Sequence, residues 1–178
     1  MSFQEFFQTE VRPALMKELG IKNINAVPRL VKVVINVGAG EAVTNKGAIA
    51  KIQEQISIIA GQKAVITKAR KSVSAFKIRE GLAIGVKVTL RGARMYHFIQ
   101  KLVTIVIPRL RDFRGIEDST VDLHGNLNLG LTEQTLFPEI EYDKVDKLRG
   151  LQVTIVTTAK DKQKGRLLFE KLGVAFKK

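Results

Sequence analysis

The stretch Val31-Lys-Val-Val-Ile-Asn-Val37 decides the fold, because every second residue in it is Val or Ile. A period of two predicts a β-strand that buries one face and leaves Lys32 and Asn36 on the other. The turn Gly38-Ala-Gly40 follows, and after it isoleucines recur at helical spacing up to a glycine stop. They are Ile49, Ile52, Ile56 and Ile59, followed by Gly61.

The same alternation returns between Ile84 and Arg91, with Gly85, Lys87 and Thr89 on the polar side. Apolar runs predict two more strands, at residues 64–69 and 151–158. A hairpin is expected from the pattern of residues 121–129, with its turn at 124–126.

Helices are expected at both ends of the chain and in its middle. Ser2 and Glu5 form a capping-box pattern for a first helix that Pro13 kinks or restarts and Gly20 ends. A second helix buries a stripe of apolar residues and stops at Pro108, and a third closes the chain. The two stripes consist of Met95, Phe98, Leu102 and Ile105, and of Leu167, Leu168 and Leu172.

These elements predict an α+β fold. The strands are not apolar on both faces, as strands of a parallel sheet would be. We therefore expect a mostly antiparallel sheet with helices packed on one face and the other face open. No repeat or Gly/Ser linker divides the sequence, so a single domain over residues 1–178 is expected.

The net charge of +13 calls for a polyanionic partner, most often a nucleic acid. Between Lys63 and Arg94 lie nine Lys or Arg residues and one carboxylate, Glu80, so this segment carries +8. Charge that only serves solubility would be less concentrated. An anionic membrane surface is a weaker alternative, because no expected helix has the Lys/Arg-rich polar face that it needs.

The polar side of the expected strands carries donors and cations and no carboxylate, which would repel phosphates. We therefore interpret the open face as a surface for RNA. Aromatic residues are scarce on these strands, so base stacking is disfavoured and recognition of a folded RNA by shape and backbone is favoured. The outward set is Lys32, Asn36, Lys87, Thr89, Arg91, Gln152, Thr154 and Thr158.

Residues 70–83 form a long basic loop that contains one aromatic residue, Phe76. A long loop in a compact domain is usually functional, and we expect this one to be flexible when free and ordered on RNA. The carboxylates Glu139, Glu141, Asp143 and Asp146 are either a solvated acidic patch or a docking site for a basic protein.

Enzymatic patterns are absent from the sequence. It has no cysteine, and His97 and His124 lie far apart, so we expect no disulfide, metal or other cofactor. Gly38-x-Gly40 lies between a strand and a helix, but Val43 stands where a dinucleotide-binding motif has its third glycine. The start of the chain lacks the apolar core of a signal peptide, and the run 102–107 is too short to cross a bilayer.

Several stretches, in the same order along nearly the whole chain, resemble the ribosomal protein L5 family, whose members bind 5S rRNA in the large subunit. The bacterial members are the closer likeness. The stretches are Ile35-Asn-Val-Gly-Ala-Gly-Glu-Ala42, Ala60-Gly-Gln-Lys63, Thr67-Lys-Ala-Arg-Lys-Ser72, Phe76-Lys-Ile-Arg79, Lys87-Val-Thr-Leu-Arg-Gly92, Ile107-Pro-Arg-Leu-Arg-Asp-Phe-Arg-Gly115, Phe137-Pro-Glu-Ile140 and Asp146-Lys-Leu-Arg-Gly150.

The resemblance implies a structural protein of the cytoplasmic ribosome that attaches 5S rRNA to 23S rRNA in the central protuberance, beside neighbouring large-subunit proteins. Together with the polar face and the glycine turn, it predicts 5S rRNA binding at Asn36, Gly38, Gly40, Gln62, Lys63, Thr67, Thr89 and Arg91. It implies that the basic loop contacts P-site tRNA through Arg70, Lys71, Ser72, Phe76, Lys77 and Arg79. It also implies a bridge to a small-subunit head protein through Arg109, Arg111, Asp112, Arg114, Glu139 and Glu141.

The chain departs from the family pattern in two places. Residues 121–126 read Val-Asp-Leu-His-Gly-Asn where the family has Phe-Asp-Gly-x-Gly-Asn, and Gly173-Val-Ala-Phe176 replaces Gly-x-Pro-Phe. The turn shapes at these two places cannot be carried over from the family.

Overall fold

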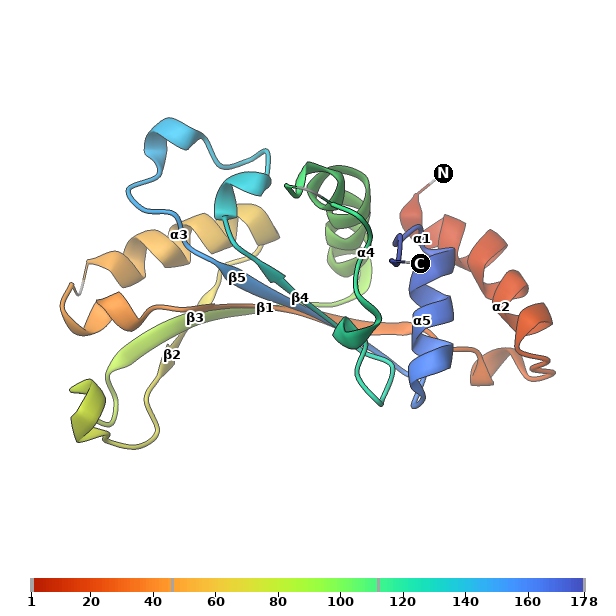
Figure 1. Ribbon diagram of the computed structural model, residues 1–178, viewed down its shortest axis with the longest axis horizontal. Helices are drawn as coiled ribbons and strands as arrows, with labels where there is room; N and C mark the ends of the chain where they lie inside the picture. Colours follow the sequence, from red (N-terminus) through yellow and green to blue (C-terminus); the bar gives the residue numbers. More distant parts are fainter. Residues whose placement is uncertain (1, 46, 112, 178) are drawn as a thin grey trace. The chain divides into compact units, whose positions relative to one another are not determined.

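The computed structural model describes residues 2–45, 47–111 and 113–177. Its strands form one antiparallel sheet in the order β2-β3-β1-β5-β4, and the α+β prediction is confirmed (Figure 1). The strands are β1 Leu30–Gly38, β2 Val65–Lys68, β3 Ala83–Leu90, β4 Leu127–Leu131 and β5 Leu151–Thr157. The α-helices are α1 Phe3–Phe6, α2 Arg12–Glu18, α3 Ala48–Ala60, α4 Gly92–Lys101 and α5 Lys162–Lys171.

The chain divides into two compact units, and each consists of separate stretches of sequence. Unit 1 comprises Met1–Val33, Arg91–Leu129 and Thr154–Lys178, and unit 2 comprises Val34–Leu90 and Gly130–Val153. Whether residues 1–178 behave as a single domain stays a prediction.

In unit 2, α3 covers one face of the strands. Its isoleucine stripe is buried as predicted, and the helix packs on β3 and β2. It ends at Gly61, which has a φ of +62°. On β3, Val86 and Val88 are buried while Lys87 between them is exposed, so the predicted alternation is confirmed.

Unit 1 contains the N-terminal helix, whose capping box is confirmed. Ser2 Oγ accepts from the Glu5 backbone N–H, and the Glu5 carboxylate accepts from that of Ser2. The structure adds a wide π-helical turn at Phe7–Val11, just ahead of Pro13, where the proline cannot donate a backbone hydrogen bond. Gly20, with a φ of +62°, follows the helix end as predicted.

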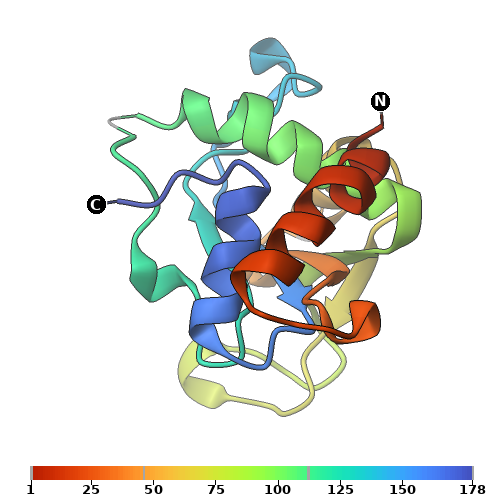
Figure 2. The ribbon, with the colours of Figure 1, turned by 90° about the vertical axis from the view of Figure 1, so that its right-hand side faces the viewer.

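The second predicted helix, which lies in unit 1, changes its helical type along its length. It runs as α4 to Lys101, then as a π-helical turn at Leu102–Val106, and it closes as a 3-10 turn at Ile107–Arg109 that contains Pro108. The predicted stripe is buried except for Ile105, which is half-buried. Within this unit α2 lies beside α5, and α1 lies beside α4 (Figure 2).

The predicted hairpin around residues 124–126 is reduced to one antiparallel bridge, between Val121 and Leu127. The Asp122 carboxylate accepts from the backbone N–H groups of His124 and Asn126 and so shapes the turn. Asn126 in turn accepts from the backbone N–H of Thr157 at 3.0 Å. The turn is therefore anchored to the end of β5, and only the second arm continues as a strand.

Close packing of two glycines gives a sharp test of the unit 1 core. A Cβ at Gly165 on α5 would lie 2.4 Å from the Cα of Gly125. Gly165→Ala should therefore lower the free energy of unfolding by about 2 kcal/mol or more, because overpacking outweighs the gain in helix propensity of about 1 kcal/mol. Urea denaturation measures this loss.

Gly130→Ala is the matched control, since nothing lies within 4 Å of its Cβ position and its φ is not positive. A Gly165→Ala protein as stable as the wild type would mean that α5 does not pack against the 122–126 turn in this way.

Candidate nucleic-acid interface

The side of the unit 2 strands opposite α3 carries mostly polar residues, several of which are exposed. Asn36 and Gly38 are exposed at the end of β1, next to the buried Val37. On the paired strands, Val65 lies opposite Lys87 and Thr67 lies opposite Gly85. Because side chains alternate along a strand, these residues share the face that α3 leaves open.

Gly85 allows the strands to approach closely in the middle of this face. A Cβ at this position would lie 2.7 Å from Thr67 Oγ1 and 2.9 Å from the Val37 carbonyl oxygen. Without a side chain at Gly85, the Thr67 hydroxyl can sit close to the end of β1. The structure thus brings Thr67 near the glycine turn, as the predicted site requires.

A second part of the predicted site lies where α3 ends. Gln62 follows the C-cap of α3 and donates from Nε2 to the Thr89 carbonyl oxygen at 3.2 Å. The neighbouring Lys63 is exposed. Seven of the eight predicted 5S rRNA residues belong to unit 2, whereas Arg91 belongs to unit 1, where it is the exposed N-cap of α4.

Gly38 and Gly40 are not required by the packing of this chain. Neither has a positive φ, and nothing lies within 4 Å of the Cβ position of either residue. The space in front of this turn is open, which would let a partner approach the backbone closely. This geometry agrees with the prediction that the two glycines permit close approach. The backbone conformation of the turn does not itself require glycine at either position.

One carboxylate, Glu41, lies directly after this turn, in a 3-10 helix formed by Gly40–Val43. Its carboxylate accepts from Arg149 Nε, and its other oxygen lies 3.1 Å from Lys147 Nζ. Arg149 also binds Asp146 with both terminal nitrogens, Nη1 at 2.8 Å and Nη2 at 3.2 Å. The acidic group beside the predicted RNA surface is therefore neutralised.

These ion pairs shift the ionisation of the groups involved. The hydrogen bond from Arg149 lowers the pKa of Glu41 below its ordinary value, although partial burial opposes this. The same guanidinium lowers the pKa of Asp146 much further, and Asp146 raises the pKa of Arg149 in return. Both carboxyl groups therefore lose their protons at a lower pH than an unpaired carboxyl group does.

The basic loop between β2 and β3 contains regular backbone hydrogen bonding. Val73 and Ile78 exchange two backbone hydrogen bonds, of 2.9 and 3.1 Å, around a 3-10 turn at Ser74–Phe76. Lys77 ends that turn with a φ of +54°. The loop is thus a small hairpin, and its expected flexibility in the free protein stays a prediction.

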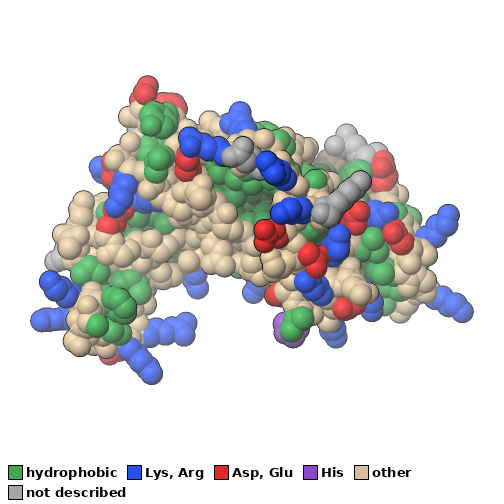
Figure 3. All heavy atoms as spheres, in the orientation of Figure 1, with side chains coloured by type: hydrophobic (Ala, Val, Ile, Leu, Met, Phe, Trp, Pro, Cys, Tyr) green, Lys and Arg blue, Asp and Glu red, His purple; other side chains and the backbone are tan. Residues whose placement is uncertain are grey.

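The predicted tRNA residues surround this hairpin. Arg70, Lys71, Ser72, Lys77 and Arg79 are exposed, and Phe76 is 71% exposed. Figure 3 shows Lys and Arg side chains projecting around the loop at the lower left of the view. The loop therefore offers cations on several sides of one bare aromatic ring.

The predicted bridge residues belong to two different units. Arg109, Arg111 and Arg114 are exposed in unit 1, and Asp112 lies outside the described residues. Glu139 and Glu141 are exposed in unit 2. The exposure of each group suits contact with a partner. Because the two groups belong to different units, each is considered separately.

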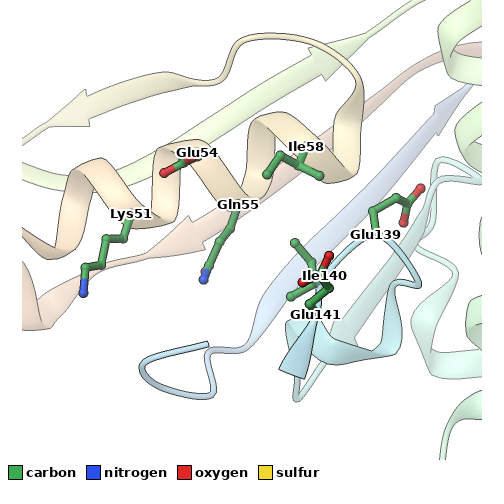
Figure 4. A pocket seen from close by; sticks show the side chains of 7 residues that line it. All are labelled: Lys51, Glu54, Gln55, Ile58, Glu139, Ile140 and Glu141. Carbon is green, nitrogen blue, oxygen red and sulfur yellow. The ribbon is translucent and has the colours of Figure 1, made fainter. Parts of the chain in front are cut away.

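The two glutamates help to line a hollow in unit 2 of about 310 Å³ between α3 and residues 139–141 (Figure 4). Glu54, Lys51 and Gln55 line it from α3, together with Ile58, which is 48% exposed. Asp146, the fourth carboxylate of the predicted acidic patch, does not line the hollow and instead pairs with Arg149 and Lys51. A solvated patch and a docking site remain the two interpretations of the other carboxylates.

Neither a metal-binding cluster nor a membrane-spanning helix occurs among the described residues. Among residues 2–45, 47–111 and 113–177, no group of three or more His, Cys, Asp or Glu residues could hold a metal ion. In the same part of the chain no helix is long and apolar enough to cross a membrane. His97 and His124 are exposed.

Sequence reasoning missed three residues of this region: Glu41, Gln134 and Arg149. Gln134 is buried, with a relative exposure of 2%, and its side chain binds the backbone of residues 147 and 149. The only signal in the sequence was that Glu41 is a carboxylate beside an otherwise acid-free surface.

Known proteins resemble this chain over almost its whole length. Residues 23–79 match the family model described as ribosomal protein L5, and residues 83–176 match the model of the C-terminus of the same ribosomal family. The large ribosomal subunit protein uL5 of Fervidobacterium nodosum is 55% identical over 98% of this chain and 95% of its own length. Those of Roseiflexus castenholzii and Brevibacillus brevis are 55% and 50% identical, each over 98% of this chain and 97% of their own.

An antiparallel sheet with an acid-free open face and a basic hairpin thus occurs in a structural protein of the large ribosomal subunit, and not in an enzyme. The chain belongs to the ribosomal protein L5 family. It acts in the cytoplasm as a part of the ribosome.

The ion pairs of Arg149 predict a specific pH dependence. Because the pKa values of Glu41 and Asp146 are lowered on folding, their contribution is complete above their ordinary values of 4.5 and 3.8 and is lost as the pH falls. Arg149→Met should cost about 2 kcal/mol of unfolding free energy near neutral pH, since charged hydrogen bonds are lost. Urea denaturation should show this cost shrinking towards about pH 3.

Lys164→Met removes an exposed cation of α5 and is the control, with a small effect at every pH. A cost of Arg149→Met that is the same in acid and at neutral pH would contradict an ionic origin of the stabilisation.

Proposed function

We propose that this chain binds 5S rRNA through the open face of unit 2 and helps to attach it to 23S rRNA in the central protuberance. The observation that carries the proposal is the absence of Asp and Glu from every described strand, while Lys87 and Asn36 are exposed on the open side. Cations and neutral donors can contact phosphates and riboses, and a carboxylate would repel them.

The residue types on this face support a folded RNA as the ligand. Val65 is the large apolar side chain that it exposes, and no Phe, Tyr or Trp occurs in the described strands. Base stacking on strand aromatics, which single-strand binders use, is thus not available. Contacts to the backbone and to 2′-hydroxyls from Asn36, Thr67 and Thr89 suit a double-helical or looped RNA surface.

The hairpin between β2 and β3 is proposed to contact P-site tRNA. Its exposed cations, Arg70, Lys71, Lys77 and Arg79, suit a phosphate backbone, and Phe76 suits an exposed base or ribose. The loop projects from one end of two strands, so it can reach a ligand other than the one on the sheet face.

Protein partners complete the proposal. Arg109, Arg111 and Arg114 of unit 1 and Glu139 and Glu141 of unit 2 are proposed to meet a small-subunit head protein across an intersubunit bridge. Asp112 is assigned to the same contact but lies outside the described residues. Charged surface groups favour such a contact because charge complementarity sets orientation and partner choice. Neighbouring large-subunit proteins are proposed as further contacts.

Substitutions on the sheet face test the 5S rRNA assignment. Asn36→Ala and Thr89→Ala should each weaken binding of 5S rRNA by about 1–3 kcal/mol, because each leaves a buried RNA group without its hydrogen-bond partner. Filter binding with purified 5S rRNA measures the effect, and circular dichroism checks the fold.

Asn25→Ala and Thr9→Ala, at exposed positions of unit 1, are matched controls and should bind like the wild type. Wild-type affinity in both Asn36→Ala and Thr89→Ala, with the fold intact, would show that the RNA binds elsewhere.

Shortening the basic hairpin tests the division of labour between the two surfaces. Replacing residues 71–79 with a short Gly-Ser turn should leave 5S rRNA affinity unchanged, because that contact is assigned to the sheet face. It should speed dissociation of P-site tRNA from reconstituted ribosomes, because loop cations that neutralise phosphates are lost.

A triple substitution of Lys71, Lys77 and Arg79 by Gln keeps the loop length and should reproduce the tRNA effect. If 5S rRNA affinity collapses in the shortened protein while tRNA dissociation stays normal, the two assignments are wrong.

A further inference from the structure

Five charged side chains of unit 2 form one connected cluster, which we call the Arg149 brace. It consists of Glu41, Lys51, Asp146, Lys147 and Arg149. Arg149 lies at its centre, with a side chain that is only 9% exposed and that binds Glu41 and Asp146 at once. A guanidinium is suited to this position because its planar fork of donors can satisfy two carboxylates in fixed directions.

The backbone that carries Arg149 is itself held firmly. The buried Gln134 accepts from the Arg149 backbone N–H through Oε1 and donates from Nε2 to the Lys147 carbonyl oxygen at 2.7 Å. A Cβ at Gly150 would lie only 3.1 Å from the Leu131 carbonyl oxygen, so the chain also runs close to the end of β4 here. Arg149 therefore projects from a backbone that is hydrogen-bonded to Gln134 and lies close to the end of β4.

The other end of the brace is the turn that follows β1. The Ala39 backbone N–H donates to the Ile84 carbonyl oxygen at 2.9 Å, which ties the entry of the turn to β3. Gly38 and Gly40 lack the side chains that would restrict their backbone, and nothing lies within 4 Å of the Cβ position of either residue. After Gly40, the contact from Arg149 to Glu41 ties the turn to a different part of unit 2.

We propose that Arg149 is a positioning residue for RNA binding: by holding Glu41, it fixes the glycine turn of residues 38–43 in the shape that 5S rRNA requires. This inference rests on the proposed function. A turn that visits the binding shape only part of the time binds more weakly by that fraction. The brace removes this loss before the RNA arrives, which is preorganisation of the site.

Two simpler roles of the Arg149 brace predict other effects on 5S rRNA binding than positioning does. If Arg149 served only to neutralise Glu41, then removing the carboxylate would remove repulsion and 5S rRNA would bind more tightly. If the brace served only stability, its loss would lower the free energy of unfolding and leave the affinity of the folded protein unchanged. Positioning alone predicts weaker binding when a negative charge is taken away from the RNA surface.

The test uses the full-length chain and purified 5S rRNA, with two variants of the brace. Glu41→Ala removes the carboxylate, and Arg149→Lys keeps the positive charge but loses the fork. Each should weaken 5S rRNA binding about tenfold, as expected if the turn keeps the binding shape for roughly a tenth of the time. The slope of log affinity against log salt should stay at its wild-type value, because no phosphate contact is removed.

Asp118→Asn is the matched control, since it breaks ion pairs with Lys162 and Arg166 in unit 1. Its affinity should equal that of the wild type. Urea denaturation identifies conditions in which all the proteins are folded, and affinities are compared only there.

The outcomes separate the inference from the function on which it rests. Wild-type or tighter binding by Glu41→Ala, with the wild-type chain binding 5S rRNA specifically, overturns positioning and leaves the proposed function standing. A wild-type chain that binds 5S rRNA no better than an unrelated structured RNA overturns the proposed function itself. A tenfold loss in both brace variants, absent in Asp118→Asn, supports the inference.

Discussion

The packing of α3 on β3 and β2 is the constraint on which the candidate interface depends. The isoleucine stripe of α3 buries Val86 and Val88, and each such side chain contributes about 1.5–3 kcal/mol when removed from water. Because side chains alternate along a strand, burying this face commits Lys87 and Thr89 to the other. A shift of one residue in the register would bury the lysine and expose the valines. The hydrophobic contact thus decides which polar groups can meet an RNA.

Carboxylates next to this interface are held by cations. Glu41 and Asp146 share Arg149, which keeps both ionised and leaves little net negative charge beside the open face. A similar arrangement occurs in unit 1, where the hydrogen bond from Lys162 lowers the pKa of Asp118. In a chain of net charge +13, this local pairing takes the charge of Glu41 and Asp146 out of competition with the exposed cations of the open face.

Periodicity was sufficient to predict the elements that carry the interface. The alternation from Val31 to Val37 and the isoleucines of α3 report burial directly, so β1, α3 and their polar side could be predicted. Local spacing did not contain the shape of the basic loop, whose hairpin depends on the bridge between Val73 and Ile78. The π-helical turns near Pro13 and Pro108 were missed because sequence patterns assume a regular helix.

The Arg149 brace was beyond sequence reasoning for a different reason. Arg149 and Glu41 are 108 residues apart, and only the tertiary fold of unit 2 brings them together. Gln134 is likewise a polar residue that looks like a surface residue until its buried amide is seen to bind the backbone of residues 147 and 149. Long-range polar contacts leave no periodic trace in a single sequence.

Hydroxyl-radical footprinting of the free and the 5S rRNA-bound protein tests the central claim most directly. Val65 and Ile58 are aliphatic side chains of unit 2 that are 60% and 48% exposed, the first on the open face and the second on α3. The account predicts that 5S rRNA protects Val65 from oxidation and leaves Ile58 as reactive as before. Protection of Ile58 with an unchanged Val65 would contradict it, because the RNA would then lie on the helical side.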